Sequence, residues 1–390
     1  MRILLVLLCA AAAFAQRTLD YDHSVVKQTR IDLRDLGYYP ADVIPPDECA
    51  IRALAVAPDG TLFGATSGKR SHLFLMRPAH GFVQPLGVLK GVSTVHHALT
   101  IAPNGDVFIG GSIGVDNNGD GYKGYEGGHV YKYVPDGREE AGPIRVDTPA
   151  NVTDLGIPVP GQGIYAMASD ATGRLYGVSY PDGQLWTNAA GGKFEVLGRI
   201  AERRPPGEKF EHDLNLGRSI VVFKNAAYVS GENGSIWRAF GDRLERTGLT
   251  APTVKGREPY NRVDAWTEGP EGILYGGTSD GYLFRMQGGK IENLGKPLNQ
   301  YRIRGLVYAP NGLLYGVGGD DDEMARLFSY DPKRGVYEML GMIDVSRRPY
   351  YGWQAYRVDA MAVGPDGAVY MGQAERKSRL YLYYPEHRPH

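Results

Sequence analysis

Five side chains with acid–base or anion-binding chemistry stand at related places along the sequence: His97, His129, Tyr180, Arg218 and Tyr260. An arginine, aided by one histidine, would neutralise a carboxylate and so acidify the proton on the neighbouring carbon. A histidine or tyrosine would then remove that proton, and a tyrosine would protonate the departing oxygen. This set suits β-elimination from a uronate sugar, which is chemistry that requires no metal.

Each of these residues also has an ordinary structural interpretation. A single histidine at the start of a strand is more often a hydrogen-bonded core or surface residue than a catalyst. The chain has 26 tyrosines, so Tyr180 or Tyr260 could simply pack within a blade. Arg218 could pair with Asp213 or Asp264. The catalytic hypothesis therefore depends on whether the fold brings these side chains to one side of one face.

A repeat of seven copies supplies that fold. Each copy has alternating apolar residues, then Pro-Asp-Gly or a relative, then Leu-Tyr-Gly or a relative, which predicts two strands joined by a tight turn. The copies are IRALAVAPDGTLFG from Ile51, HALTIAPNGDVFIG from His97, IYAMASDATGRLYG from Ile164, RSIVVFKNAAYVSG from Arg218, VDAWTEGPEGILYG from Val263, IRGLVYAPNGLLYG from Ile303 and VDAMAVGPDGAVYM from Val358.

A third and a fourth strand are expected after most copies. The third is aromatic, as in HLFLM, HVYKY and QLWTN, and the fourth ends near Leu-Gly, as in KFEVLG and KIENLG. Four strands per unit, seven times, predict an all-β, seven-bladed β-propeller with antiparallel blades. The last copy lacks a fourth strand, whereas TRIDLRDLG from Thr29 resembles one. We expect this N-terminal strand to complete the last blade and close the ring.

Alignment of the copies places a polar residue at the start of every inner strand. The seven are Arg52, His97, Tyr165, Arg218, Asp264, Arg304 and Asp359. The third strands begin on the same face with His72, His129, Gln184, Ser235, Tyr282, Arg326 and Arg379. A wet channel mouth would accept any polar residue there, so this pattern alone does not identify a site.

Three loops that feed this face are rich in arginine and aromatic residues: 202–218, 254–262 and 346–357. Guanidinium groups bind carboxylates and sulfates with paired hydrogen bonds, and aromatic rings stack on sugar faces. We therefore expect an acidic polysaccharide as substrate. The residues expected to bind it are Arg52, Tyr165, Arg304, Arg326 and Trp353.

The loop DNNGDGYKGYE interrupts the second repeat and has the residue pattern of a calcium-binding loop. Oxygen ligands would come from Asp116, Asn118, Asp120 and Glu126, with Gly121 at the bend. Its twelfth position is glycine, unlike an EF-hand, and a glycine-rich turn is the plain alternative. We expect calcium with a structural role and no organic cofactor.

Residues 1–15, MRILLVLLCAAAAFA, have a basic start, an apolar run and an Ala-Phe-Ala end, which predict a cleaved signal peptide. The protein is then secreted or periplasmic, and residues 16–390 form one propeller domain, expected to be a monomer. No later run is apolar enough to cross a membrane.

The net charge of -1 gives no reason to expect nucleic acid as a partner. Cys49 would be a small core residue.

The arrangement resembles the seven-bladed propeller polysaccharide lyases of the ulvan lyase type. The resemblance implies that His97 and His129 match that family's two histidines in one blade. By blade position its tyrosines match Tyr180, with Tyr165 as a rival, and Tyr260, while its arginine matches Arg218. The alternatives are a non-catalytic propeller that binds glycan or protein, and a calcium-dependent propeller hydrolase such as a lactonase. The histidine cluster of a manganese-dependent oligogalacturonate lyase is not visible.

Overall fold

The computed structural model describes residues 31–32, 44–45, 47–77, 83–114, 124–136, 148–188, 192–201, 216–319, 323–347, 351–375 and 378–385. Side chains are described for all of these except 31–32, 344–347 and 351–354. The predicted signal peptide, and Asp116, Asn118 and Asp120 of the predicted calcium loop, lie outside this part of the chain. None of the described helices is long and apolar enough to cross a membrane.

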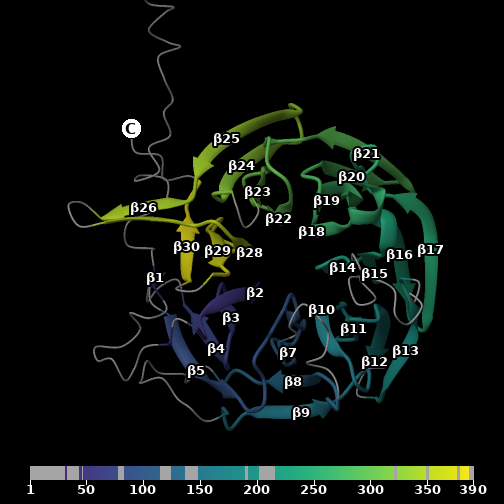
Figure 1. Ribbon diagram of the computed structural model, residues 1–390, viewed down its shortest axis with the longest axis vertical. Helices are drawn as coiled ribbons and strands as arrows, with labels where there is room; N and C mark the ends of the chain where they lie inside the picture. The colour runs from purple at the N-terminus through teal and green to yellow at the C-terminus, as the bar shows by residue number, and fades with distance from the viewer. Residues whose placement is uncertain are drawn as a thin grey trace, which may run out of the picture.

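Seven four-stranded antiparallel sheets surround a central axis, as the repeats predict (Figure 1). The first four blades contain β2 (Ala50–Val56), β3 (Leu62–Ser67), β4 (Ser71–Met76) and β5 (Val83–Leu89); β6 (Leu99–Ile101), β7 (Val107–Gly111), β8 (His129–Tyr133) and β9 (Val152–Gly156); β10 (Gly163–Ser169), β11 (Leu175–Tyr180), β12 (Gln184–Asn188) and β13 (Phe194–Arg199); β14 (Ile220–Phe223), β15 (Ala226–Ser230), β16 (Ser235–Phe240) and β17 (Arg243–Thr250).

The remaining three blades complete the ring. They contain β18 (Val263–Glu268), β19 (Leu274–Thr278), β20 (Leu283–Gln287) and β21 (Lys290–Gly295); β22 (Ile303–Tyr308), β23 (Leu314–Gly318), β24 (Arg326–Asp331) and β25 (Val336–Met342); β28 (Val358–Val363), β29 (Val369–Gln373), β30 (Arg379–Tyr383) and the N-terminal β1 (Ile31–Asp32). Every predicted repeat therefore supplies the inner two strands of one blade.

The N-terminal strand closes the ring. β1 pairs antiparallel with β30, with Ile31 opposite Leu380 and Asp32 opposite Arg379. In Figure 1 the yellow strands of the last blade lie beside the purple strands of the first. The prediction of an N-terminal fourth strand is confirmed.

The glycine of the Leu-Tyr-Gly pattern makes room for the aromatic residue of the third strand. A Cβ atom at Gly64 would lie 2.2 Å from the Phe74 ring, and one at Gly177 would lie 2.2 Å from the Trp186 ring. Gly276 and Gly316 stand in the same relation to Phe284 and Phe328, each at 2.3 Å. These aromatic rings are fully buried. The repeat signature is thus a packing requirement of the blade.

Two features depart from or extend the sequence analysis. The segment expected as a loop at 346–357 contains the hairpin β26 (Asp344–Arg347) and β27 (Tyr351–Gln354) instead. Trp353 lies on β27, beyond the residues with described side chains. Cys49 is buried, as expected of a core residue, and its sulfur accepts a hydrogen bond from the Ser378 backbone N–H at 3.2 Å.

Candidate functional site

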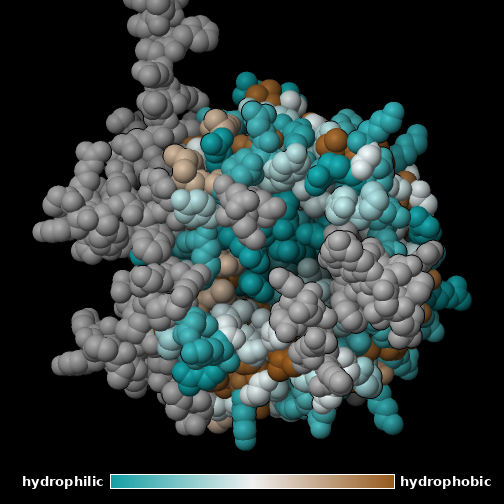
Figure 2. All heavy atoms as spheres, in the orientation of Figure 1, coloured by the Kyte–Doolittle hydropathy of each residue, from teal (hydrophilic) through white to brown (hydrophobic). Residues whose placement is uncertain are grey.

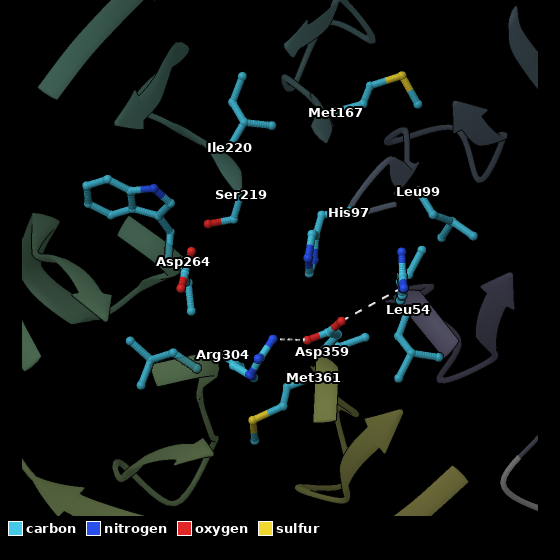
Figure 3. A pocket seen from close by; sticks show the side chains of 17 residues that line it. Leu54, His97, Leu99, Met167, Ser219, Ile220, Asp264, Arg304, Asp359 and Met361 are labelled. Atoms are coloured by element: carbon cyan, nitrogen blue, oxygen red, sulfur yellow. Dashed lines mark hydrogen bonds and ion pairs between the residues drawn. The ribbon is translucent and has the colours of Figure 1, made fainter. Parts of the chain in front are cut away.

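A cavity of about 180 Å³ lies on the propeller axis, lined by inner-strand residues of all seven blades (Figure 3). Its polar lining comes from the strand starts, including Arg52, His97, Asp264, Arg304 and Asp359. Two residues further along each strand the lining becomes apolar, with Leu54, Leu99, Met167, Trp266, Leu306 and Met361. The cavity therefore has a polar ring at its mouth and an apolar ring beneath. Figure 2 shows hydrophilic residues gathered at the centre of this view.

β-Bulges recur at the polar ring. The strand pairing shifts between Ile51 and Ala53, which leaves Arg52 as the extra residue. The same shift occurs in four other blades, at Tyr165, Asp264, Arg304 and Asp359. A bulge turns a side chain away from its regular direction and is frequent beside functional sites. Five blades thus share a β-bulge at the strand-start position that is polar in every copy of the repeat.

Asp359 is the centre of the ring's ion pairs. Its carboxylate accepts a hydrogen bond from Arg304 Nη1 at 2.7 Å and another from Arg357 Nε at 2.9 Å. Arg52 Nε and Arg218 Nη1 each lie 3.8 Å from the same carboxylate. Although burial alone would raise the pKa of Asp359, these guanidinium groups hold it well below its usual value. Asp359 is therefore ionised at neutral pH.

Asp264 forms the second ion-pair centre. It accepts hydrogen bonds from Arg262 Nε and Arg302 Nε, both at 2.9 Å. Burial opposes its ionisation, but Arg302 and Arg262 outweigh burial and lower the pKa of Asp264. Burial also lowers the pKa of Arg302 to about 10, which leaves it charged at neutral pH. Across both centres six guanidinium groups meet two carboxylates, an excess of four positive charges.

Two adjacent histidines stand beside this cationic ring and are uncharged. Burial is the main cause that lowers the pKa of His97 to about 4, and that of His96 well below its usual value. His96 Nε2 lies 3.2 Å from Arg52 Nη1. Because a guanidinium group only donates, Nε2 is the acceptor and the proton of neutral His96 is on Nδ1. Neither His96 Nδ1 nor His97 Nε2 has a hydrogen-bond partner among the residues that the structure describes.

Two tyrosines continue the site from the histidines. The Tyr165 ring lies 4.9 Å from the His96 ring and 5.3 Å from the Tyr180 ring, measured between centroids. The Tyr165 hydroxyl and Arg218 share a hydrogen bond, and Tyr165, Asp359 and Asp264 outweigh burial to raise the pKa of Arg218. The Nε of Arg218 has no hydrogen-bond partner in the described part of the chain. Arg218 therefore keeps an unused, buried hydrogen-bond donor beside the cavity.

The structure gathers some of the predicted residues and leaves others elsewhere. Arg52, His97 and Arg304 line the cavity, and Tyr165, Tyr180 and Arg218 adjoin it. His129 does not line the cavity; its Nδ1 lies 2.8 Å from Asp154 on β9, and its ring stacks on Tyr131. Tyr260 is 58 % exposed in a 3-10 turn, η6 (Glu258–Tyr260), before β18.

Other predicted residues lie apart from the cavity or outside the described side chains. Arg326 begins β24, paired with Gly318 and Met342, and is absent from the cavity lining. Glu126 is exposed, and its backbone carbonyl accepts a hydrogen bond from Gly161. Among the described residues no three His, Cys, Asp or Glu side chains form a group that could hold a metal. Calcium binding by the 116–126 loop stays a prediction.

Four residues of the ring escaped the sequence analysis: His96, Arg262, Arg302 and Arg357. A signal for the arginines was present, since Arg-Val-Asp occurs at both Asp264 and Asp359, and Arg-Ile-Arg ends at Arg304. Each arginine stands two residues before a ring position. The sequence alone could not show that these arginines pair with Asp264 and Asp359, because the pairing depends on side-chain directions and on distances between blades. His96 was hidden because the alignment assigned only His97 to the polar column.

Comparison with known proteins supports the fold. No protein-family model matches the chain, and no curated protein matches it in sequence. Among solved structures, a streptogramin B lyase superposes with a TM-score of 0.61 at 15% identity, covering 88% of this chain and 95% of that chain. A catalytically inactive virginiamycin B lyase from Staphylococcus aureus with quinupristin gives 0.59 at 12% identity, covering 88% and 97%. The WD40 propeller domain of Doa1 gives 0.53 at 11% identity, covering 87% and 94%. At these identities the likeness extends to the propeller fold alone.

Proposed function

We propose that the protein is a secreted polysaccharide lyase that cleaves a uronate-containing, ulvan-like polysaccharide by β-elimination. The observation that carries the proposal is the axial cavity, where an excess of four positive charges surrounds a neutral histidine. Such a site favours the carbanion-like intermediate of β-elimination, whose negative charge spreads onto the substrate carboxylate. The lyase names of two structural neighbours agree with the reaction class but concern other substrates.

The cavity suits one anionic group of a larger chain. Its volume of about 180 Å³ is below the roughly 300–1,000 Å³ of pockets that enclose a drug-sized ligand. An oligosaccharide does not fit within it, whereas a carboxylate does. The polysaccharide would therefore lie across the mouth and direct a uronate carboxylate towards Arg218, Arg52 and Arg304.

The proton transfers can then be assigned to the residues beside the carboxylate. His97, neutral at physiological pH, accepts the C5 proton, and the C5 electron pair forms the C4–C5 double bond as the C4–O4 bond breaks. Tyr165 donates its proton to the departing O4, with Tyr180 packed against its ring. The products are an unsaturated uronate and a new chain end bearing a hydroxyl. The proton on His97 and the proton missing from Tyr165 are then exchanged with solvent.

An absorbance assay tests this proposal directly, because the unsaturated uronate absorbs ultraviolet light. We expect a rise in absorbance with an ulvan-type polysaccharide, and its loss in His97→Ala. Arg285→Gln is the matched control, since Arg285 forms an exposed ion pair with Glu292 on the outer strands. Absence of any new absorbance across a broad panel of uronate polysaccharides, with an intact circular dichroism spectrum, would overturn the proposal.

A non-catalytic glycan- or protein-binding propeller is the second candidate. One observation favours it: a pKa of about 4 makes His97 a weak base, whereas a general base works best with a pKa near the operating pH. A carboxylate bound at the ring would raise this pKa by offsetting the positive charge. Binding of an acidic glycan without any cleavage would support the second candidate.

A further inference from the structure

We propose that three tyrosines and two cations on blade five and the segments that flank it form a second binding surface, on which a segment of acidic polysaccharide lies beside the axial cavity. The residues are Tyr260, Arg257, Tyr301, Lys296 and Tyr282, and we call this set the tyrosine–cation ladder. The inference deepens the proposed function, on which it rests for the substrate class. It concerns binding along the chain and assigns no further catalytic residue.

The ladder alternates rings and positive charges. The Arg257 guanidinium carbon lies 5.6 Å from the Tyr260 ring centroid and 5.1 Å from the Tyr301 centroid. Lys296 Nζ lies 5.2 Å from the Tyr301 centroid and 5.7 Å from the Tyr282 centroid. Each cation thus stands between two aromatic rings at cation–π distance. Tyr260 and Tyr301 are 58% and 45% exposed, so their rings are accessible from solvent.

A buried carboxylate fixes the orientation of Arg257. Asp280, which is fully buried, accepts hydrogen bonds from Arg257 Nε at 2.8 Å, Thr253 Oγ1 at 2.6 Å and the Val254 N–H at 3.1 Å. Arg257 itself keeps 43% of its side chain exposed. Within the described residues its two terminal nitrogens donate no hydrogen bond. The guanidinium group is therefore held in place by its Nε while its outer edge remains available to an anion.

The ladder adjoins the arginine ring through the backbone. Tyr301 directly precedes Arg302, which binds Asp264, and Tyr260 stands two residues before Arg262, which binds the same carboxylate. Arg302 has a φ of 62°, a left-handed conformation that non-glycine residues rarely adopt. The left-handed turn lets Arg302 point to the axis while Tyr301 faces solvent. Such strained residues are concentrated at functional sites.

This combination identifies an acidic glycan as the ligand. Flat exposed rings offer stacking surfaces for the C–H faces of sugars, and the fixed guanidinium and ammonium groups offer partners for sulfates and carboxylates. The rings are already ordered by the cations between them, so binding costs little additional side-chain entropy. A polysaccharide whose carboxylate enters the axial cavity would extend over this blade.

Isothermal titration calorimetry with size-defined ulvan oligosaccharides tests the inference. We expect Tyr301→Ala and Arg257→Gln each to raise the Kd about tenfold, from the loss of one stacked ring or one fixed charge. Tyr301→Phe should retain the affinity, because the ring remains. Phe240→Ala is the matched control: Phe240 is 58% exposed, as Tyr260 is, but lies at the turn between β16 and β17, away from this face. Desulfated oligosaccharides should bind more weakly than the sulfated ones.

The outcomes separate this inference from the proposed function. Unchanged affinity in Tyr301→Ala and Arg257→Gln, with cleavage of the polysaccharide intact, would overturn the proposal that the ladder binds glycan. It would leave the proposed lyase activity standing. Loss of affinity in both variants, with no unsaturated product from the wild type, would support glycan binding by the ladder and overturn the proposed lyase activity. Equal loss of affinity in Phe240→Ala, or equally tight binding of a phosphopeptide or a single-stranded nucleic acid, would contradict the assignment of an acidic glycan.

Discussion

Arg304 and Asp359 form a hydrogen-bonded ion pair between two neighbouring blades beside the propeller axis, 2.7 Å from Nη1 to Oδ1, with side chains only 2% and 1% exposed. The pair joins the inner strands of blades six and seven, and the same carboxylate attracts Arg52, Arg218 and Arg357. One buried negative charge therefore holds together arginines from four blades. Its removal would leave their positive charges facing one another in a site with little water.

Replacement of Asp359 should be severely destabilising. We expect Asp359→Asn to lower the free energy of unfolding by about 3–5 kcal/mol, the range for breaking a buried ion pair. Urea denaturation followed by fluorescence would measure it. Glu292→Gln is the control, because the exposed Arg285–Glu292 pair should contribute less than about 1 kcal/mol. A stability change in Asp359→Asn no larger than in Glu292→Gln would contradict the central role of this carboxylate.

Stability should fall as the pH is lowered from neutral, because of His97. Its pKa is lowered from 6.5 to about 4 in the folded protein, so the unfolded chain binds a proton first. The destabilisation begins below about pH 6.5, approaches about 1.4 kcal/mol per pH unit, and levels off below about pH 4. Urea titrations at several pH values would give the free energy of unfolding as a function of pH. This free energy should depend less steeply on pH in His97→Gln than in the wild type. Identical slopes would show that His97 is not held neutral by the fold.

Arg218 should matter for turnover on charged substrates. We expect Arg218→Gln to lower kcat/KM on a uronate polysaccharide by about 100-fold or more, as for the loss of one group that stabilises developing charge. The effect should appear in kcat as well as in KM if Arg218 stabilises the intermediate. A change in KM alone would restrict Arg218 to ground-state binding.

Calcium should stabilise the protein if the 116–126 loop binds it. Adding a chelator is then expected to lower the Tm, and excess calcium to restore it. Asp116→Ala with Asp120→Ala should abolish the chelator effect while leaving the cavity residues unchanged. A Tm that is insensitive to chelator in the wild-type protein would overturn the prediction of a calcium site.

Ring closure by the N-terminal strand should be essential for solubility. Deletion of residues 16–36 removes β1 and uncovers the edge of β30, along Leu380 and Arg379. We expect a lower Tm and concentration-dependent aggregation, because an unpaired strand edge can pair with another chain. Light scattering during thermal unfolding would detect it. A monomeric truncated protein with an unchanged Tm would contradict this role of β1.

The sequence alone determined the ring and its polar mouth. Seven copies of one turn-and-glycine pattern set the blades, because Gly64 and its equivalents admit the aromatic side chain of the next strand. The polar column followed from the same alignment, since period and position are local properties of the chain.

Only the tertiary structure decided which polar residues meet. The distances from Asp359 to arginines of four blades depend on ring closure and on the bulges, and neither distance nor bulge can be derived from spacing. His129 likewise contacts Asp154 instead of the cavity, because it lies on the third strand of its blade, next to β9, whereas the cavity is lined by inner-strand residues. Contacts between residues far apart in sequence are fixed by the folded ring, and they determine where positive charge gathers.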